Sequence, residues 1–195
     1  MSVRWERIGR RKAYAGHVVD VDVDTVRVAA DGDVREREYD VVRHPGAASM
    51  VPLHDDGTVS LVRQFRYPVG GEILEIPAGS LGEGETYEAC ARREIEEEIG
   101  CRGGRWTPLA TFYTTPGFCD EEMRVFLVEE LEPGERSLEK DEHLRVARIP
   151  FLEAIARISR GGIHDAKTIA GLHLARARLE EEGRWPPGRR AEGLT

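Results

Sequence analysis

Three glutamates on one face of a predicted helix constrain this chain more than any other feature of its sequence. The pattern over residues 86–99 predicts a helix that ends at Gly100, with Glu94, Glu97 and Glu98 at positions i, i+3 and i+4. Stacked like charges cost roughly a few tenths of a kcal/mol per pair, and the helix dipole disfavours anions near the C-terminal end. Stability therefore does not explain them. A bound divalent cation would, because Mg²⁺ and Mn²⁺ prefer carboxylate oxygens.

An ordinary solvated glutamate face is the alternative, and the three carboxylates taken alone favour it. The Gly-rich segment 79–84, directly ahead of the helix, weakens that interpretation. Arg93 weakens it further, because its side chain can pair with Glu85 or with a neighbouring glutamate and fix its orientation. Ile95 and Ile99 give the helix an apolar flank that can dock on a sheet.

Residues 79–101 resemble the Nudix box, a motif with many fixed positions. The matching residues are Gly79, Glu85, Arg93, Glu94, Ile95, Glu97, Glu98, Gly100 and Cys101. Only the last position departs from the family pattern, which usually has Ile, Leu or Val there. Because a buried cysteine packs as a small apolar residue, we expect a difference in packing and no loss of chemistry.

The resemblance implies a pyrophosphohydrolase that uses divalent metal to split the diphosphate bond of a nucleoside diphosphate compound. It implies that Glu94 and Glu98 are the principal metal ligands, and that Glu97 binds directly or through water. The backbone carbonyl of Ala78 is expected to join them. Mg²⁺ is the expected metal, with Mn²⁺ as an alternative. Such ions neutralise phosphate charge and lower the pKa of the attacking water.

A second motif, after the box, indicates the substrate. Pro116, Gly117 and Glu121 lie in a segment that resembles the Pro-Gly loop of ADP-ribose pyrophosphatases, where the matching glutamate helps to hold the ribose end. Arg66 resembles the strand-end arginine that binds the diphosphate, because a planar guanidinium pairs with phosphate oxygens. The alternative for the Pro-Gly segment is a plain turn between two strands, and the alternative for Arg66 is an exposed cation at a strand end. We expect hydrolysis of ADP-ribose to AMP and ribose 5-phosphate.

The resemblance to this subfamily suggests three further assignments: a general base, a helix start and a residue that stacks on adenine. Glu142, just before a predicted strand, is our choice of catalytic general base, with Glu97 as the second candidate and His143 as the third. The motif Asp165-Ala166-Lys167-Thr168 also resembles the subfamily, and we interpret it as a capped helix start without a catalytic role. The candidates for a residue that stacks on adenine are Trp5, Tyr14 and Tyr39.

The pattern of apolar residues predicts an α/β fold, and the resemblance implies the Nudix α/β/α sandwich with a mixed sheet. The sequence pattern predicts strands over residues 13–28, 35–42, 47–53, 59–65, 72–76, 109–113, 124–129 and 144–149, and helices over 150–159 and 166–181. Asp20, Asp22 and Asp24 alternate with valines, which favours a solvated sheet face. We expect an N-terminal antiparallel strand unit (residues 1–45), a Nudix domain (46–182) and a flexible tail (183–195). The resemblance implies a homodimer that exchanges the N-terminal unit.

Composition excludes several other classes of protein. The net charge of −8 argues against nucleic-acid and membrane partners. Three cysteines without C-x-x-C spacing argue against zinc or disulfides, and favour a cytoplasmic location. The polar N-terminus does not resemble a signal peptide, and no apolar run approaches a membrane span.

Two alternatives to ADP-ribose hydrolysis stay open, and a third is disfavoured. The substrate of the same chemistry could be a nucleotide sugar, a dinucleotide cofactor or FAD. The chain could also be a Nudix ligand-binding module without turnover, although such modules usually lose box glutamates that this chain keeps. An RNA-end processing hydrolase is disfavoured, because the chain is acidic and has no basic stripe with aromatic residues.

Overall fold

The computed structural model describes residues 3–17, 19–138 and 143–188 of the chain. They divide into two compact units. Unit 1 takes in Met1–Gly46 and Tyr113–Glu122, and unit 2 takes in Ala47–Phe112 and Met123–Thr195. The Pro-Gly loop thus belongs to unit 1. No helix among the described residues is long and apolar enough to cross a membrane.

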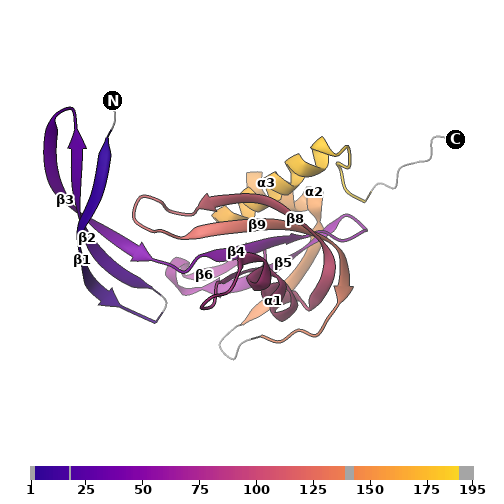
Figure 1. Cartoon of the computed structure of the whole chain (residues 1–195). Helices are drawn as coiled ribbons and strands as arrows, with labels where there is room; N and C mark the ends of the chain where they lie inside the picture. The colour runs from indigo at the N-terminus through magenta and orange to yellow at the C-terminus, as the bar shows by residue number, and fades with distance from the viewer. Residues whose placement is uncertain (1–2, 18, 139–142, 189–195) are drawn as a thin grey trace. The chain divides into compact units, whose positions relative to one another are not determined.

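Unit 1 is built on a three-stranded antiparallel sheet in the order β1-β2-β3, drawn in indigo and violet in Figure 1. The strands are β1 (Arg4–Ala15), β2 (Asp20–Ala30) and β3 (Asp33–Arg43). Asp31 and Gly32 make the tight turn before β3, both with positive φ. The sequence analysis placed only the end of β1, because arginine and lysine side chains replace the apolar alternation there.

For Asp22 and Asp24 of β2, the interpretation as a solvated face was wrong. Asp22 and Asp24 are 3% and 7% exposed. Arg43 donates from Nε to Asp22 (3.0 Å) and from Nη2 to Asp24 (2.5 Å), and Arg10 donates from Nε to Asp24 (3.3 Å). Burial raises the pKa of Asp24, but the hydrogen bonds from Arg43 and Arg10 outweigh it and hold that pKa below its ordinary value. These aspartates are therefore structural anchors.

Unit 2 contains two sheets. The four-stranded sheet is mixed: β4 pairs with β9 in parallel and with β7 antiparallel, in the order β7-β4-β9-β8. Its strands are β4 (Ala47–Pro52), β7 (Ala78–Ser80), β8 (Cys101–Tyr113) and β9 (Glu122–Pro133). The second sheet is antiparallel, in the order β10-β5-β6. It consists of β5 (Thr58–Arg66), β6 (Gly71–Glu75) and β10 (Leu144–Pro150), and the 3₁₀ helix η1 (Tyr67–Val69) joins β5 to β6.

Helices cover both faces of the mixed sheet (Figure 1). They are α1 (Tyr87–Ile99), α2 (Phe151–Ser159) and α3 (Ala166–Glu181). Along β4, Met50 packs in a cluster with Ile95 of α1, whereas Val51 packs in a cluster with Phe151 of α2 and Leu172 of α3. This period of two explains why every residue of β4 is buried. The predicted α/β/α sandwich with a mixed sheet is confirmed, together with the N-terminal antiparallel strand unit.

Part of the C-terminal segment beyond α3 is packed. Trp185 lies edge-on to Phe151, with ring centroids 5.2 Å apart, and packs against the core. Arg184 pairs with the buried Glu129. The flexible tail stays a prediction, and residues 189–195 lie outside the described part of the chain.

Candidate active site

Helix α1 begins and ends where its capping residues place it. The Thr86 side chain accepts a hydrogen bond from the Ala89 N–H (3.2 Å), and Gly100 ends the helix with a φ of 66°. Ile95 is fully buried, so the helix docks by this side. Glu94 and Glu98 lie on the flank of the docked side and are only 7% and 3% exposed. The glutamates are therefore not an ordinary solvated face.

Strand β7 passes directly against both buried carboxylates. A Cβ atom added to Gly79 would lie 1.8 Å from Oε1 of Glu94, so the contact requires glycine at this position. One residue earlier, the Ala78 N–H donates to Oε2 of Glu98 (3.1 Å). This contact with Glu98 comes from the Ala78 amide group. The role of the Ala78 carbonyl as a metal ligand stays a prediction.

The Arg93 guanidinium donates hydrogen bonds to three carboxylates in and next to α1. It donates from Nε and Nη2 to Glu85 (3.0 and 3.1 Å), and from Nη1 to Glu94 (2.6 Å) and Glu97 (3.0 Å). The Arg93 hydrogen bonds, with one from the Gly82 N–H, hold the pKa of Glu85 below its ordinary value. Both partners that the sequence suggested for Arg93 are therefore used at once, and one guanidinium fixes three carboxylates.

The chemistry of these donors fits a hard divalent cation. Buried carboxylates are unfavourable without compensating charge, and Arg93 brings one positive charge to the carboxylates of Glu85, Glu94 and Glu97. Among the described residues, however, no three acidic, histidine or cysteine side chains converge as a metal site does. Arg93 Nη1 contacts one oxygen of Glu94 and one of Glu97, so each of these carboxylates keeps a second oxygen that does not bond to Nη1.

A buried ion cluster in unit 2 was missed in the sequence analysis. Arg66, at the end of β5, donates from Nε and Nη2 to the two oxygens of Glu75 (2.8 and 2.9 Å). Lys167 of α3 donates to the same carboxylate, which is 1% exposed. Burial raises the pKa of Glu75, but Arg66 and Lys167 outweigh it and hold that pKa below its ordinary value. A lone carboxylate between Leu74 and Ile76 was the available signal.

The Pro-Gly loop of unit 1 is fixed by the end of β3. Arg43 Nη1 donates to Asp120 (3.0 Å), and the His44 N–H donates to the other oxygen of that carboxylate (2.8 Å). Thr114 donates from its hydroxyl to Oε2 of Glu121 (2.5 Å), while His44 Nε2 lies 3.8 Å from Oε1. One oxygen of the Glu121 carboxylate is thus held by Thr114, and the His44 ring lies near the other.

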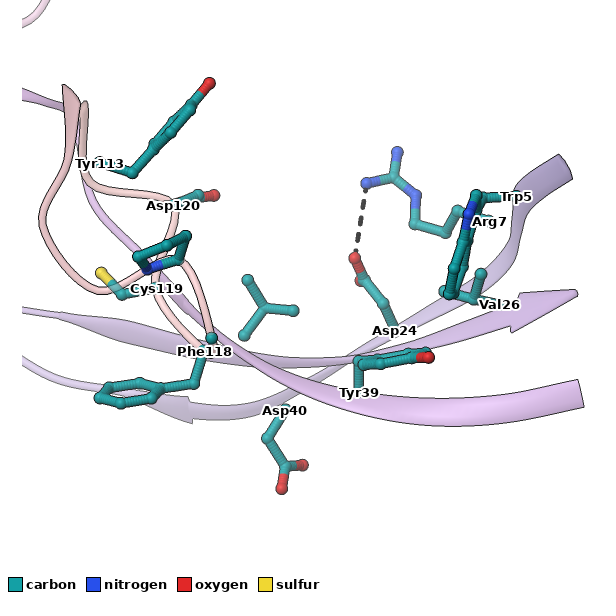
Figure 2. Close-up of a pocket in the computed structure, with 13 residues that line it drawn as sticks. Trp5, Arg7, Asp24, Val26, Tyr39, Asp40, Tyr113, Phe118, Cys119 and Asp120 are labelled. Atoms are coloured by element: carbon teal, nitrogen blue, oxygen red, sulfur yellow. Dashed lines mark ion pairs between the residues drawn. The ribbon is translucent and has the colours of Figure 1, made fainter. Parts of the chain in front are cut away.

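Unit 1 also contains a pocket of about 510 Å³ next to this loop. Figure 2 shows the rings of Trp5 and Tyr39 on one side of it and those of Tyr113 and Phe118 on the other. The Trp5 and Tyr39 rings lie 6.2 Å apart, edge to face. The remaining lining residues are Arg7, Asp24, Val26, Asp40, Val41, Pro116, Gly117, Cys119 and Asp120. Aromatic walls with a few polar groups suit a flat heterocyclic ring.

The residues expected to form the site fall into three groups. Arg66, Ala78, Glu94, Glu97 and Glu98 lie in unit 2, where Arg66 also interacts electrostatically with Glu98. The residues in unit 1 are Pro116, Gly117 and Glu121. The proposed base, Glu142, lies outside the described residues.

Comparisons with known proteins agree with this arrangement. A family model described as the NUDIX domain matches residues 43–172. The chain is 38% identical to an ADP-ribose pyrophosphatase of Bacillus subtilis, over 86% of this chain and 90% of that protein. It is 33% identical to a GDP-mannose pyrophosphatase of Yersinia pestis, over 90% of this chain and 93% of that protein. The crystal structure of an ADP compounds hydrolase, at 21% identity, superposes with a TM-score of 0.81 over 93% of this chain and 97% of that chain.

Proposed function

This chain belongs to the Nudix family of pyrophosphohydrolases, and from that premise we propose that it hydrolyses the diphosphate bond of ADP-ribose to AMP and ribose 5-phosphate. The observation that carries the proposal is the pair of buried carboxylates, Glu94 and Glu98, held under β7 beside Glu97. A binding module has no need of buried like charges on one helix face. The relative from Bacillus subtilis supports ADP-ribose as the substrate.

Nudix enzymes depend on divalent metal, and we propose Mg²⁺ for this chain, with Mn²⁺ as an alternative. Glu94, Glu97 and Glu98 would hold it, together with the Ala78 carbonyl. When bound, the metal neutralises charge on the diphosphate and acidifies the attacking water. Arg93 would keep the carboxylates of Glu94 and Glu97 in place for the metal, and it is itself held by its two hydrogen bonds to Glu85.

The remaining roles fall to groups that touch the substrate. Arg66 would bind the diphosphate, and Glu121, in the Pro116–Gly117 loop, would hold the ribose end. The proton of the attacking water would pass to Glu142, or to Glu97 if the loop carboxylate does not serve. Positioning and charge stabilisation account for most of the rate in such transfers.

We expect Glu121→Ala to raise the KM for ADP-ribose by about tenfold with little change in kcat, because it removes hydrogen bonds to the ribose end. The variant should melt normally, since Thr114 and His44 lose only one partner each. Glu130→Ala is the control, because Glu130 is an exposed glutamate that pairs with Arg105. Unchanged kinetics in Glu121→Ala would show that the loop does not handle the substrate.

The aromatic pocket of unit 1 is our proposed site for the adenine ring, with Tyr39 and Trp5 as stacking residues. Stacking of one base on one aromatic side chain contributes about 1–3 kcal/mol. Tyr39→Ala should therefore weaken binding of ADP-ribose by about tenfold or more and leave binding of inorganic pyrophosphate unchanged, as measured by calorimetry in EDTA. Tyr14→Ala is the matched control, because Tyr14 is exposed on β1 and does not line the pocket. Equal losses for both ligands would contradict this assignment.

We also propose a homodimer, which exchanges the N-terminal strand unit (residues 1–45), and a cytoplasmic location. The sheet of this strand unit supports the homodimer, because it exposes the apolar side chains of Ile8 and Val34. Three free cysteines agree with the cytoplasmic location. Light scattering on the purified protein measures the mass, which should be twice that of one 21.8 kDa chain. A monomer at micromolar concentration would exclude the exchange.

The direct test of the reaction is product analysis. Purified protein with excess Mg²⁺ and ADP-ribose should release AMP and ribose 5-phosphate, and EDTA should stop the release. Binding of ADP-ribose without any product would favour the ligand-binding module instead. Turnover of only FAD or a dinucleotide cofactor would support the proposed hydrolysis of a diphosphate bond and would show that ADP-ribose is not the substrate.

A further inference from the structure

The start of α3 is tied to the segment between β6 and β7. Thr168 Oγ1 accepts from the Ile76 N–H (2.8 Å), and its hydroxyl donates to Asp165 (2.5 Å). Next to it, Lys167 donates to Glu75 and lies 3.0 Å from Asp165. The Asp165–Thr168 motif therefore does more than cap a helix, because it places a buried ammonium group against Glu75.

The burial of this cluster separates it from ordinary surface ion pairs. The side chains of Glu75 and Lys167 are 1% and 13% exposed. By contrast Glu72, on the same strand, pairs with Arg145 at 2.8 Å with side chains 45% and 71% exposed. A pair of this exposed kind contributes little, whereas a buried carboxylate needs its partners and fixes their geometry.

The hydrogen bonds to Glu75 set the orientation of the Arg66 guanidinium. Nε and Nη2 both donate to Glu75, and within the described residues Nη1 donates no hydrogen bond. The side chain of Arg66 remains 42% exposed, so Nη1 and the second N–H of Nη2 can meet a ligand. Because Glu75 fixes the guanidinium along its Nε–Nη2 edge, the Nη1–Nη2 edge points in a defined direction. Two parallel N–H groups in such an orientation suit phosphate oxygens.

We propose that Glu75 and Lys167 are positioning residues that hold Arg66 in the orientation in which it binds a phosphate group of the substrate. Glu75 fixes the guanidinium directly. Lys167 acts one step away, because it holds the second oxygen of Glu75 and keeps the carboxylate from rotating. This inference rests on the proposed hydrolysis of a nucleoside diphosphate compound.

A double-mutant cycle tests the proposal. Glu75→Gln is made alone and in the Arg66→Ala background, and kcat/KM for ADP-ribose is measured with Mg²⁺. Loss of a hydrogen bond to a charged group corresponds to about a tenfold loss or more, so Glu75→Gln should lower kcat/KM by about tenfold. In the Arg66→Ala background the same change should cost less than about twofold, because the group it positions is gone.

Lys167→Met provides a second cycle with Arg66→Ala in case Glu75→Gln does not fold. It should lower kcat/KM several-fold, again only when Arg66 is present. Glu72→Gln is the control on β6 and should leave kcat/KM unchanged. Melting curves accompany every variant. A merely structural role would give equal losses with and without Arg66, and that result would overturn the proposal.

Binding of inorganic pyrophosphate separates this inference from the proposed function. Its Kd, measured in EDTA, should rise in Glu75→Gln and in Arg66→Ala to a similar extent, without a further rise in the double variant. If the unmodified protein does not hydrolyse ADP-ribose, the proposed function is wrong, and the pyrophosphate cycle still decides the inference. Additive losses of pyrophosphate affinity would contradict it.

Discussion

Glu98→Gln should abolish metal-dependent turnover while leaving the fold intact. The carboxylate is 3% exposed and accepts a hydrogen bond from the Ala78 N–H. A glutamine has nearly the same volume and its amide oxygen can still accept this bond, so packing is preserved. What it lacks is the negative charge, and a neutral amide oxygen is a weaker ligand for a hard divalent ion than a carboxylate oxygen. Metal stabilisation of the transition state contributes several kcal/mol, so we expect kcat to fall by roughly 10³-fold or more.

The measurement is kcat as a function of Mg²⁺ concentration, with a melting curve for each variant. Glu96→Gln is the matched control, because Glu96 is on the same helix turn but faces Arg102. It should retain the kinetics of the unmodified protein. Near-normal kcat in Glu98→Gln, with an unchanged melting temperature, would show that Glu98 is not a metal ligand.

Gly79→Ala is expected to have the second-largest effect, although it adds one methyl group and alters no charge. The new Cβ would lie 1.8, 2.0 and 2.6 Å from Oε1, Cδ and Cγ of Glu94, so most of that side chain has to move. Overpacking of this kind costs roughly 1–3 kcal/mol of stability. Activity should fall further, by about 10²-fold, because misplacing a reacting group by about 1 Å has effects of that size.

The kinetic signature is a higher Mg²⁺ requirement together with a lower kcat. Gly82→Ala is the control in the same loop, because its Cβ would meet Glu85 at 3.5 Å, an ordinary contact distance. If Gly79→Ala keeps both the activity and the Mg²⁺ dependence of the unmodified protein, the position of Glu94 under β7 is not important for catalysis.

Local patterns in the sequence predicted most of the elements and the helix that carries the glutamates. α1 and α3 were predicted within one residue of their bounds, because apolar periodicity and capping residues are local signals. The pattern failed for β1, where cross-strand ion pairs such as Arg10 with Asp24 replace apolar alternation. The prediction that Asp22 is solvated was also wrong. Alternation shows that successive residues face opposite sides of a sheet, but it does not show what covers each side.

In the candidate site, too, contacts between residues close in the sequence could be predicted, and contacts between residues far apart in the sequence could not. Spacing along a helix predicts that the box glutamates share one face, and the resemblance to the Nudix box suggests their role. Arg93 lies within the same motif. Glu75 and Lys167, by contrast, are 92 residues apart and belong to a strand and a helix that only the fold brings together. Their pairing has no signature in spacing. The resemblance to ADP-ribose pyrophosphatases suggested a substrate-binding arginine at Arg66, and only the structure gives the partners that orient it.

We propose that this chain hydrolyses ADP-ribose by means of the glutamates of α1 and the residues of the Pro-Gly loop. The relatives include both ADP-ribose and GDP-mannose pyrophosphatases, so the decisive measurement is kcat/KM for these two compounds side by side, with excess Mg²⁺ and with EDTA. We predict that ADP-ribose is preferred by at least about tenfold, that AMP is released, and that EDTA stops the reaction. Preference for GDP-mannose would show that ADP-ribose is not the substrate, and release of AMP at an equal rate in EDTA would show that the reaction does not need the metal.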